Sequence, residues 1–233
     1  MTSFRRQDDL FVWAHRGASA VAPENSMAAF RTAEQLGADG IELDVHLSRD
    51  GAPVVIHDET VDRTSNGTGT VAAMRASELL DLDIGSWFDK RFAGERIPLL
   101  ADVLAWAGDR LRINIEIKHR DAGQAVLELL TDFPAARVLI SSFNHKLLFR
   151  LRQQRPDLPI GFLSDTRFWR LAMRRAVVCR AESFHPAARF CSRTLIAAGQ
   201  RQGLTIYPWT VDSDTDKRRM LWLGVDGLFT NTP

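Results

Sequence analysis

Short apolar runs alternate along the chain with longer segments in which apolar residues recur every three or four positions. The short runs have the length of buried β-strands, and the longer segments have the period of amphipathic helices. This alternation is typical of βα units that build a parallel sheet. Strands are expected at residues 11–15, 39–47, 52–58, 112–118, 137–142, 159–164, 181–185, 205–210 and 226–230. Helices are expected at residues 26–37, 99–108, 121–131, 144–154, 168–178, 192–202 and 214–223.

Residues 52–58 follow the second strand after a short turn and are counted as an extension of that unit. The chain then has eight βα steps, the number found in a TIM (β/α)8 barrel. We therefore predict an α/β fold of this architecture, in one domain over residues 1–233, with a doubly wound open sheet as the alternative. The eighth helix is expected to be missing or to lie beyond Pro233.

One connection is far longer than an ordinary βα loop of about 2–6 residues. Residues 58–97 separate the second unit from the next helical pattern, and they contain a helical stretch around residues 73–83. We interpret this segment as an inserted lid or small subdomain, placed after the second strand and over one mouth of the barrel.

Composition narrows the class of protein. The 30 Lys and Arg residues nearly balance the 29 Asp and Glu residues, so no overall field favours nucleic acid or a membrane surface. The chain has no apolar run of the roughly 18 residues that a spanning helix needs, and the opening MTSFRRQDDL lacks the apolar core of a secretory signal. Cys179 and Cys191 are too few for a disulfide scaffold and are interpreted as buried thiols. A cytoplasmic location is expected.

Residues 150–180 depart from this neutral average, because they place many arginines around Phe168, Trp169 and Met173. A solvated helix face is the favoured interpretation. Weak contact with anionic lipid head groups through a basic amphipathic helix is the alternative.

Polar residues interrupt or end several predicted strands, where a buried charge is costly unless it is paired or bound to a cation. Glu42 and Asp44 lie two residues apart, as do Glu116 and Lys118, so each pair shares one face of its strand. An ion pair between Glu116 and Lys118 would explain those two alone. The full set comprises His15, Glu42, Asp44, His57, Glu116, Lys118, His185 and Trp209. Active sites of barrels form at the carboxyl ends of strands, so this convergence predicts an active site.

The residue types indicate the chemistry. Glu42, Asp44 and Glu116 offer three oxygen ligands without a thiolate, which favours Mg²⁺ or Ca²⁺ over zinc. His15 and His57 are then free for proton transfer near neutral pH.

Two cations complete the predicted site. Arg16 and Lys118 are donors suited to a phosphate, and with a divalent metal and two histidines they indicate attack on a phosphoester. His46 shares the face of Asp44, and we expect it to support the site from behind. His119 and His145 are expected on the surface.

At this point the motifs resemble a known family. HRG followed by PENS, then ELDVHLSRDGAPVVIHD, TSNGTG, IPLLADVL, NIEIK and a late YPWTVD are similar to those of the glycerophosphodiester phosphodiesterases, in the same order, over residues 12–231. The resemblance implies a TIM barrel with an insertion after the second strand. It also implies Mg²⁺- or Ca²⁺-dependent hydrolysis of small glycerophosphodiesters, such as glycerophosphocholine and glycerophosphoethanolamine, to sn-glycerol 3-phosphate and an alcohol.

The resemblance also implies roles for single residues. His15 and His57 match the family's acid/base pair, whereas Glu42, Asp44 and Glu116 match its metal ligands.

Other positions match the substrate side of the site. Arg16 and Lys118 correspond to residues that hold the phosphate. Phe143, His185 and Trp209 correspond to positions near the mouth that shape the alcohol or glycerol pocket.

In the PEN turn, Asn25 is expected to order the loop and Glu24 to lie near the site. Two positions depart from the family pattern. The family usually ends its last strand in a Thr-Asp-x-Pro-like turn, whereas this chain has Asn231 in place of the Asp. Many members carry Asn after WTV, whereas this chain has Asp212.

Three alternative functions stay open from the sequence. The first is lysophospholipase D-like cleavage of lysophospholipids at a membrane surface, which the basic segment 150–180 and an apolar lid would favour. The second is a barrel isomerase or aldolase that uses Lys118 as a Schiff base, and the third is a non-catalytic barrel that binds phosphodiesters.

Overall fold

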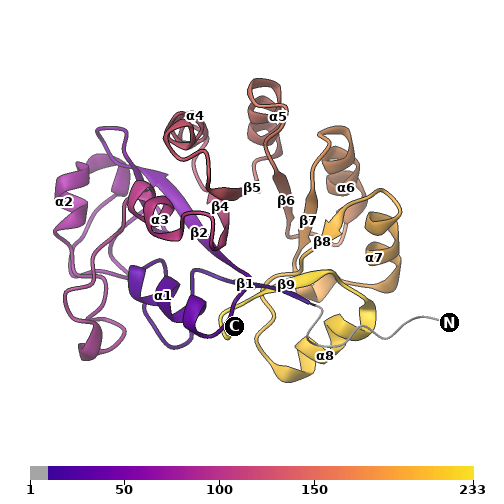
Figure 1. Ribbon diagram of the computed structural model, residues 1–233, viewed down its shortest axis with the longest axis horizontal. Helices are drawn as coiled ribbons and strands as arrows, with labels where there is room; N and C mark the ends of the chain where they lie inside the picture. Colours follow the sequence, from indigo (N-terminus) through magenta and orange to yellow (C-terminus); the bar gives the residue numbers. More distant parts are fainter. Residues whose placement is uncertain (1–9) are drawn as a thin grey trace.

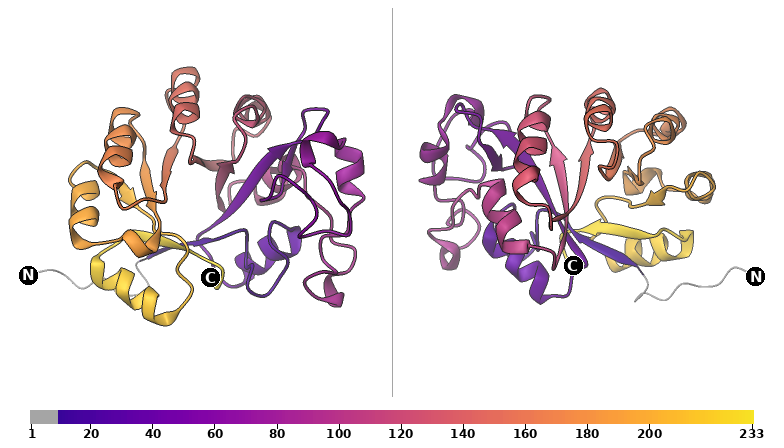
Figure 2. Two further views of the ribbon diagram at one scale, coloured as in Figure 1. Left: turned by 180° about the vertical axis from the view of Figure 1, so that it is seen from behind. Right: turned by 45° about the horizontal axis from the view of Figure 1, so that its top comes forward.

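The computed structural model describes residues 10–233, which form a nearly closed barrel of eight parallel strands (Figure 1, Figure 2). The parallel strands are β1 (Phe11–Ala14), β2 (Gly40–Leu47), β4 (Arg112–Ile117), β5 (Arg137–Ser142), β6 (Ile160–Ser164), β7 (Ser183–Pro186), β8 (Thr205–Ile206) and β9 (Gly227–Thr230). Neighbours follow the order β8-β7-β6-β5-β4-β2-β1-β9. The predicted TIM (β/α)8 barrel is confirmed, and the open-sheet alternative is wrong.

The barrel closes between β8 and β9 through separate backbone hydrogen bonds. Phe229 donates its N–H to the carbonyl of Pro208 and accepts from the N–H of Val211, each at 2.9 Å. The expected strand over residues 205–210 shortens to two residues because Pro208 has no N–H to donate to a ladder. Closure therefore depends on an irregular segment that carries Trp209 to the mouth.

Seven helices cover the outside of the barrel, each within two residues of its predicted ends. They are α1 (Met27–Gln35), α3 (Leu100–Ala107), α4 (Ala122–Leu129), α5 (His145–Gln154), α6 (Trp169–Val178), α7 (Arg193–Gln200) and α8 (Asp214–Leu223). Four of them begin at a side chain that accepts the N–H three residues further on, namely Ser26, Asn144, Ser192 and Ser213. Short 3₁₀ turns lie at Val71–Ala73, Lys90–Phe92, Leu130–Asp132 and Ala188–Phe190.

The long connection after β2 begins with a ninth strand, β3 (Pro53–Val55), which pairs with β2 in the antiparallel direction. Residues 58–97 then carry a single α-helix, α2 (Ala76–Leu80), which lies at the outer edge of the molecule (Figure 1). The segment buries a small apolar cluster of its own with residues of β3 and its flanks: Val54, Ile56, Val61, Val71, Leu79, Ile84 and Ile97. None of residues 58–97 lines the pocket that holds most of the predicted site residues, and a lid role for the segment stays a prediction.

Several smaller expectations are also settled. Cys179 and Cys191 are free, buried thiols, and His119 is exposed. His145, expected on the surface, is partly buried: its Nε2 lies 2.9 Å from the carbonyl of Leu163 and its ring packs on Phe162. Within residues 10–233, no helix is long and apolar enough to cross a membrane. The expected lack of a secretory signal falls on the chain's start, and residues 1–9 lie outside the described part.

The interior of the barrel is filled by an aromatic floor, which comprises Trp13, Tyr207 and Phe229. Trp13 stacks on Phe229 with ring centroids 5.8 Å apart and meets Tyr207 edge-on at 6.0 Å. The indole fits because the neighbouring residue on β2 is Gly40, where an added Cβ would lie 2.6 Å from the Trp13 ring. The floor supports the pocket above it, since Phe229 belongs to both.

We expect Gly40→Ala to lower the free energy of unfolding by about 1–3 kcal/mol, because the new methyl group overpacks the barrel interior. The methyl group would meet both Trp13 and the carbonyl of Arg112, at 2.6 and 2.8 Å. Chemical denaturation measures the change. Gly203→Asn is the control, since that position opens to free space and Asn tolerates its positive φ. Equal stability of Gly40→Ala and wild type would contradict this packing.

Candidate active site

Three carboxylates meet where the adjacent strands β2 and β4 approach their carboxyl ends. Asp44 and Glu116 are direct partners in the parallel register, and Glu42 lies two residues before Asp44. Potential ligand oxygens of the three residues lie within 4.8 Å of one another, and all three side chains are buried. The alternate residues of β2 face the helices instead, so the strand pattern itself delivers the cluster to the barrel interior.

Burial and the charges of neighbouring groups shift the pKa values of these three carboxyl groups. Burial, reinforced by Asp44 and Glu116, raises the pKa of Glu42 well above its usual range. Burial and Asp44 likewise raise the pKa of Glu116 to about 7. Burial alone would raise the pKa of Asp44, but the positive charges of Lys118 and Arg16 outweigh burial and lower this pKa to about 2.

Two cations reach into the cluster. Lys118 Nζ lies 2.8 Å from Glu116 Oε1 and 3.3 Å from Asp44 Oδ1, and Arg16 Nε lies 3.3 Å from Asp44 Oδ2. The ion pair that the sequence allowed between Glu116 and Lys118 is therefore present. With all groups ionised, three carboxylates and two cations leave one negative charge, so the pair does not neutralise the site.

The residues present fit a divalent cation. Glu42 Oε1 is buried and, within the described part of the chain, has no hydrogen-bond partner, although Oε2 accepts the N–H of Arg16 at 2.9 Å. Three carboxylate oxygens without thiolate or imidazole are the ligand set of Mg²⁺ or Ca²⁺. Asn25 holds Asp44 in place, because its Nδ2 donates to Asp44 Oδ2 at 2.8 Å.

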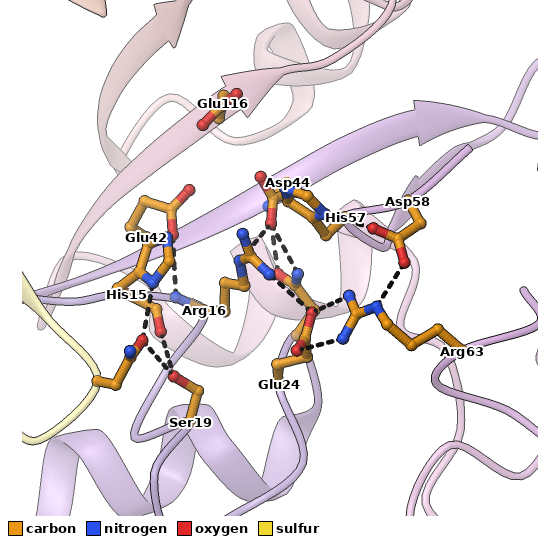
Figure 3. Close-up of polar contacts among 12 residues, drawn as sticks. His15, Arg16, Ser19, Glu24, Glu42, Asp44, His57, Asp58, Arg63 and Glu116 are labelled. Carbon is orange, nitrogen blue, oxygen red and sulfur yellow. Dashed lines mark hydrogen bonds and ion pairs between the residues drawn. The ribbon is translucent and has the colours of Figure 1, made fainter. Parts of the chain in front are cut away.

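His15 follows β1 and lines the same pocket. Its Nδ1 lies 2.8 Å from Oδ1 of Asn231, just after β9. Figure 3 shows His15 beside Arg16 and Ser19. Burial lowers the pKa of His15, and the neighbouring Arg16 lowers it further. The imidazole is therefore neutral near pH 7 and able to accept a proton.

His57, after β3, is held by a carboxylate (Figure 3). Its Nδ1 lies 2.6 Å from Asp58 Oδ1, and Arg63 Nε donates to the other oxygen of Asp58 at 2.6 Å. Arg63 also forms two hydrogen bonds with Glu24, at 2.8 and 2.9 Å, and Glu24 accepts from Arg16 at 2.9 Å. One chain of alternating charges thus joins His57 to the arginine beside His15.

Most of the predicted site residues line one pocket. Its wall consists of His15, Arg16, Glu42, His57, Asn114, Glu116, Lys118, Phe143, Leu163, Trp209 and Phe229. Phe143 and Trp209 meet edge-to-face at 5.5 Å. Asp44 lies beneath, and His46 bonds the carbonyl of His57 at 3.0 Å, as expected for support from behind.

His185 does not lie near the mouth, contrary to expectation. It is fully buried in the barrel interior, with its ring 4.9 Å from Phe229 and its Nε2 2.8 Å from the hydroxyl of Ser183. Burial lowers its pKa to about 3. Its contribution is indirect, since its carbonyl accepts the indole N–H of Trp209 at 2.9 Å.

Sequence reasoning missed Asp58, Arg63 and Asn231 as supports of the two histidines. The only local signal was Asp58, which directly follows His57. Arg63 lies five residues after Asp58, whereas Asn231 is 216 residues from His15, so only the fold brings Asn231 to its partner.

The whole of this site lies within the region that matches a known family model. That model is the glycerophosphoryl diester phosphodiesterase family, and it matches residues 15–233. The chain belongs to this family. It is similar to a glycerophosphodiester phosphodiesterase of Caldanaerobacter subterraneus, with 43% identity over 95% of this chain and 94% of the relative.

Solved structures of the family agree in fold. An Oleispira antarctica phosphodiesterase, determined in complex with the product sn-glycerol-3-phosphate, is 28% identical with a TM-score of 0.88 and covers 95% of this chain and 93% of its own. A glycerophosphodiester phosphodiesterase of Agrobacterium tumefaciens is 32% identical with a TM-score of 0.85, over 96% and 97% of the two chains. This glycerophosphodiester phosphodiesterase is accordingly an enzyme of the phosphoric diester hydrolase class, and the non-catalytic alternative is wrong.

The raised pKa of Glu116 predicts a pH-dependent stability. The folded pKa of about 7 exceeds the usual 4.5, so the folded protein binds the proton more tightly. The resulting stabilisation is complete below the unfolded pKa and is lost as pH rises through about 7. With a chelator present, the melting temperature of wild type should fall relative to that of Glu116→Gln between about pH 5 and pH 8. A constant difference between the two proteins would contradict the shift.

Proposed function

We propose that this enzyme hydrolyses small glycerophosphodiesters, such as glycerophosphocholine and glycerophosphoethanolamine, to sn-glycerol 3-phosphate and an alcohol, with one Mg²⁺ or Ca²⁺ as cofactor. The observation that carries the proposal is the pocket in which two imidazoles face three carboxylates and two cations. The product bound to the Oleispira antarctica relative supports the same chemistry here. The free thiols of Cys179 and Cys191 support a cytoplasmic location.

Glu42, Asp44 and Glu116 would hold the cation. When bound, it supplies positive charge that stabilises charge developing on the phosphoryl oxygens. Its two charges would turn the net negative cluster into a net positive one, which complements the single negative charge of a phosphodiester. Arg16 and Lys118 line the same pocket and would bind the phosphate through charge-assisted hydrogen bonds.

His15 and His57 would carry the proton transfers. Each has Nδ1 engaged by an oxygen, which leaves Nε2 for the substrate. One imidazole takes the proton of the nucleophile, which is either water or the glycerol 2-hydroxyl, and the other donates a proton to the departing alkoxide, so no strong base is released. When the 2-hydroxyl attacks, the product is a cyclic phosphate, which water opens in a second step with the two roles exchanged. Phe143 and Trp209 would shape the pocket for the glycerol or alcohol half.

The Schiff-base alternative is disfavoured by the charge of Lys118. Burial alone would lower its pKa, but Asp44 and Glu116 outweigh burial and raise it. The amine is therefore protonated and not nucleophilic near neutral pH.

An assay of glycerol 3-phosphate release from a panel of glycerophosphodiesters tests the proposal. We expect turnover that EDTA abolishes and that Mg²⁺ or Ca²⁺ restores. Full turnover in EDTA, or no glycerol 3-phosphate from any member of the panel, would overturn it.

His15→Ala and His57→Ala should each lower kcat for glycerophosphocholine by about 10²–10⁴-fold, because each removes one proton-transfer group. His119→Ala is the matched control, since this histidine is exposed and outside the pocket. Steady-state kinetics at constant metal concentration measure the effect. Near-normal turnover of His15→Ala would contradict its role.

A second candidate, lysophospholipase D-like cleavage, has one observation in its favour. A groove of about 350 Å³ shares Phe143 and Leu163 with the catalytic pocket and continues along the start of α6. Phe168 and Leu171 line it with 69% and 57% of their surface exposed, and Arg175 lies beside them. Such a groove suits the acyl chain of a lysophospholipid.

The double variant Phe168→Ser/Leu171→Ser distinguishes the two candidate functions. If the groove holds an acyl chain, turnover of lysophosphatidylcholine should fall about 10-fold through lost apolar burial, while turnover of glycerophosphocholine stays unchanged. Val178→Ser is the control, because Val178 is 75% exposed on α6 but lies outside the groove. A wild type that does not cleave lysophosphatidylcholine would rule the second candidate out.

A further inference from the structure

The ring of His15 makes a single hydrogen bond within the described residues. Its Nδ1 lies 2.8 Å from Oδ1 of Asn231, which also lies 2.8 Å from the hydroxyl of Ser19. Asn231 directly follows β9, the strand that pairs with β1 beside His15. The partner of His15 is thus set by the pairing of β1 with β9.

Asp212 determines which end of the Asn231 side chain faces His15. Its carboxylate accepts from Asn231 Nδ2 at 2.8 Å and from the Asn231 backbone N–H at 2.7 Å. A carboxylate can only accept, so the NH₂ group faces Asp212 and the amide oxygen faces His15. That oxygen carries no hydrogen, so the proton of the neutral imidazole lies on Nδ1. Nε2 is then the nitrogen free to accept a proton.

We propose that Asn231 and Asp212 are positioning residues for His15, which together hold its imidazole in the Nδ1–H tautomer. The proposal rests on the proposed function, because it gives that tautomer a use in proton transfer. Neither residue contacts the carboxylate cluster, and both act on the reaction only through His15.

The pair consists of one carboxylate, Asp212, and one amide, Asn231. The exchanged arrangement would place the carboxylate at position 231 and the amide at position 212. A carboxylate at position 231 would also accept from His15 Nδ1–H, so both arrangements give one tautomer. Amides at both positions would not fix the tautomer, because the side-chain amide of Asn231 could then turn and present either its oxygen or its NH₂ group to His15.

Substitution at these positions leaves the barrel core intact. Asp212 is exposed, and with Asn231 it lines an open pocket of about 300 Å³ beside His15. Truncation there removes a hydrogen bond without leaving a buried cavity.

The kinetic test uses glycerophosphocholine with the metal-loaded enzyme. Asn231→Ala and Asp212→Asn should each lower kcat by about 10–100-fold, with KM within about threefold. The exchanged double variant Asp212→Asn/Asn231→Asp should recover kcat to within about fivefold of wild type. Asp214→Asn, a nearby exposed carboxylate outside this network, should have no effect. A double variant with a kcat as low as that of Asp212→Asn would overturn the proposal.

A second readout does not depend on turnover. Long-range ¹H–¹⁵N NMR of histidine-labelled protein, with His15→Asn to assign the signals, distinguishes protonated from unprotonated ring nitrogens. We expect a protonated Nδ1 and unprotonated Nε2 in wild type and in the exchanged variant, and averaged signals in Asp212→Asn. An Nε2–H ring in wild type would overturn the proposal. Because this readout needs no activity, it separates failure of the positioning pair from failure of the proposed function.

Discussion

The buried carboxylate cluster of Glu42, Asp44 and Glu116 is the constraint on which the site depends. Its oxygens lie within 4.8 Å of one another, and the pKa values of two members are raised because the interior cannot hold three negative charges without compensation. Lys118 and Arg16 supply part of that compensation. The remaining negative charge suits the cluster to the divalent cation proposed above, and Lys118 and Arg16 line the same pocket.

The two histidines are supported by unlike partners from different segments of the chain. Asp58, itself clamped by Arg63, holds His57, whereas the amide of Asn231 holds His15. The support of His57 comes from the segment after β3, and that of His15 directly follows β9. The placement of both histidines therefore depends on the pairing of β1 with β2 and β9, which couples the fold to the geometry of the site.

Much of this arrangement could be predicted from the sequence. The period of apolar positions located the strands and helices, and the two-residue spacing in β2 and β4 placed the carboxylates on one face. His185 shows the limit of such reasoning, because a polar residue at a strand end can turn into the barrel interior when a glycine such as Gly161 lies beside it. The roles of Arg63 and Asn231 were beyond reach, since their contacts depend on loop conformations that no periodicity encodes.

The central claim is that Glu42, Asp44 and Glu116 form a divalent cation site, and calorimetric titration of the metal-free enzyme with Mg²⁺ and with Ca²⁺ tests it most directly. The account predicts one equivalent bound by wild type and binding at least about 10-fold weaker in Glu42→Gln, which keeps the shape but removes the charge of the ligand with the unpartnered oxygen. Equal affinity in both proteins, or no binding of either ion by wild type, would contradict it.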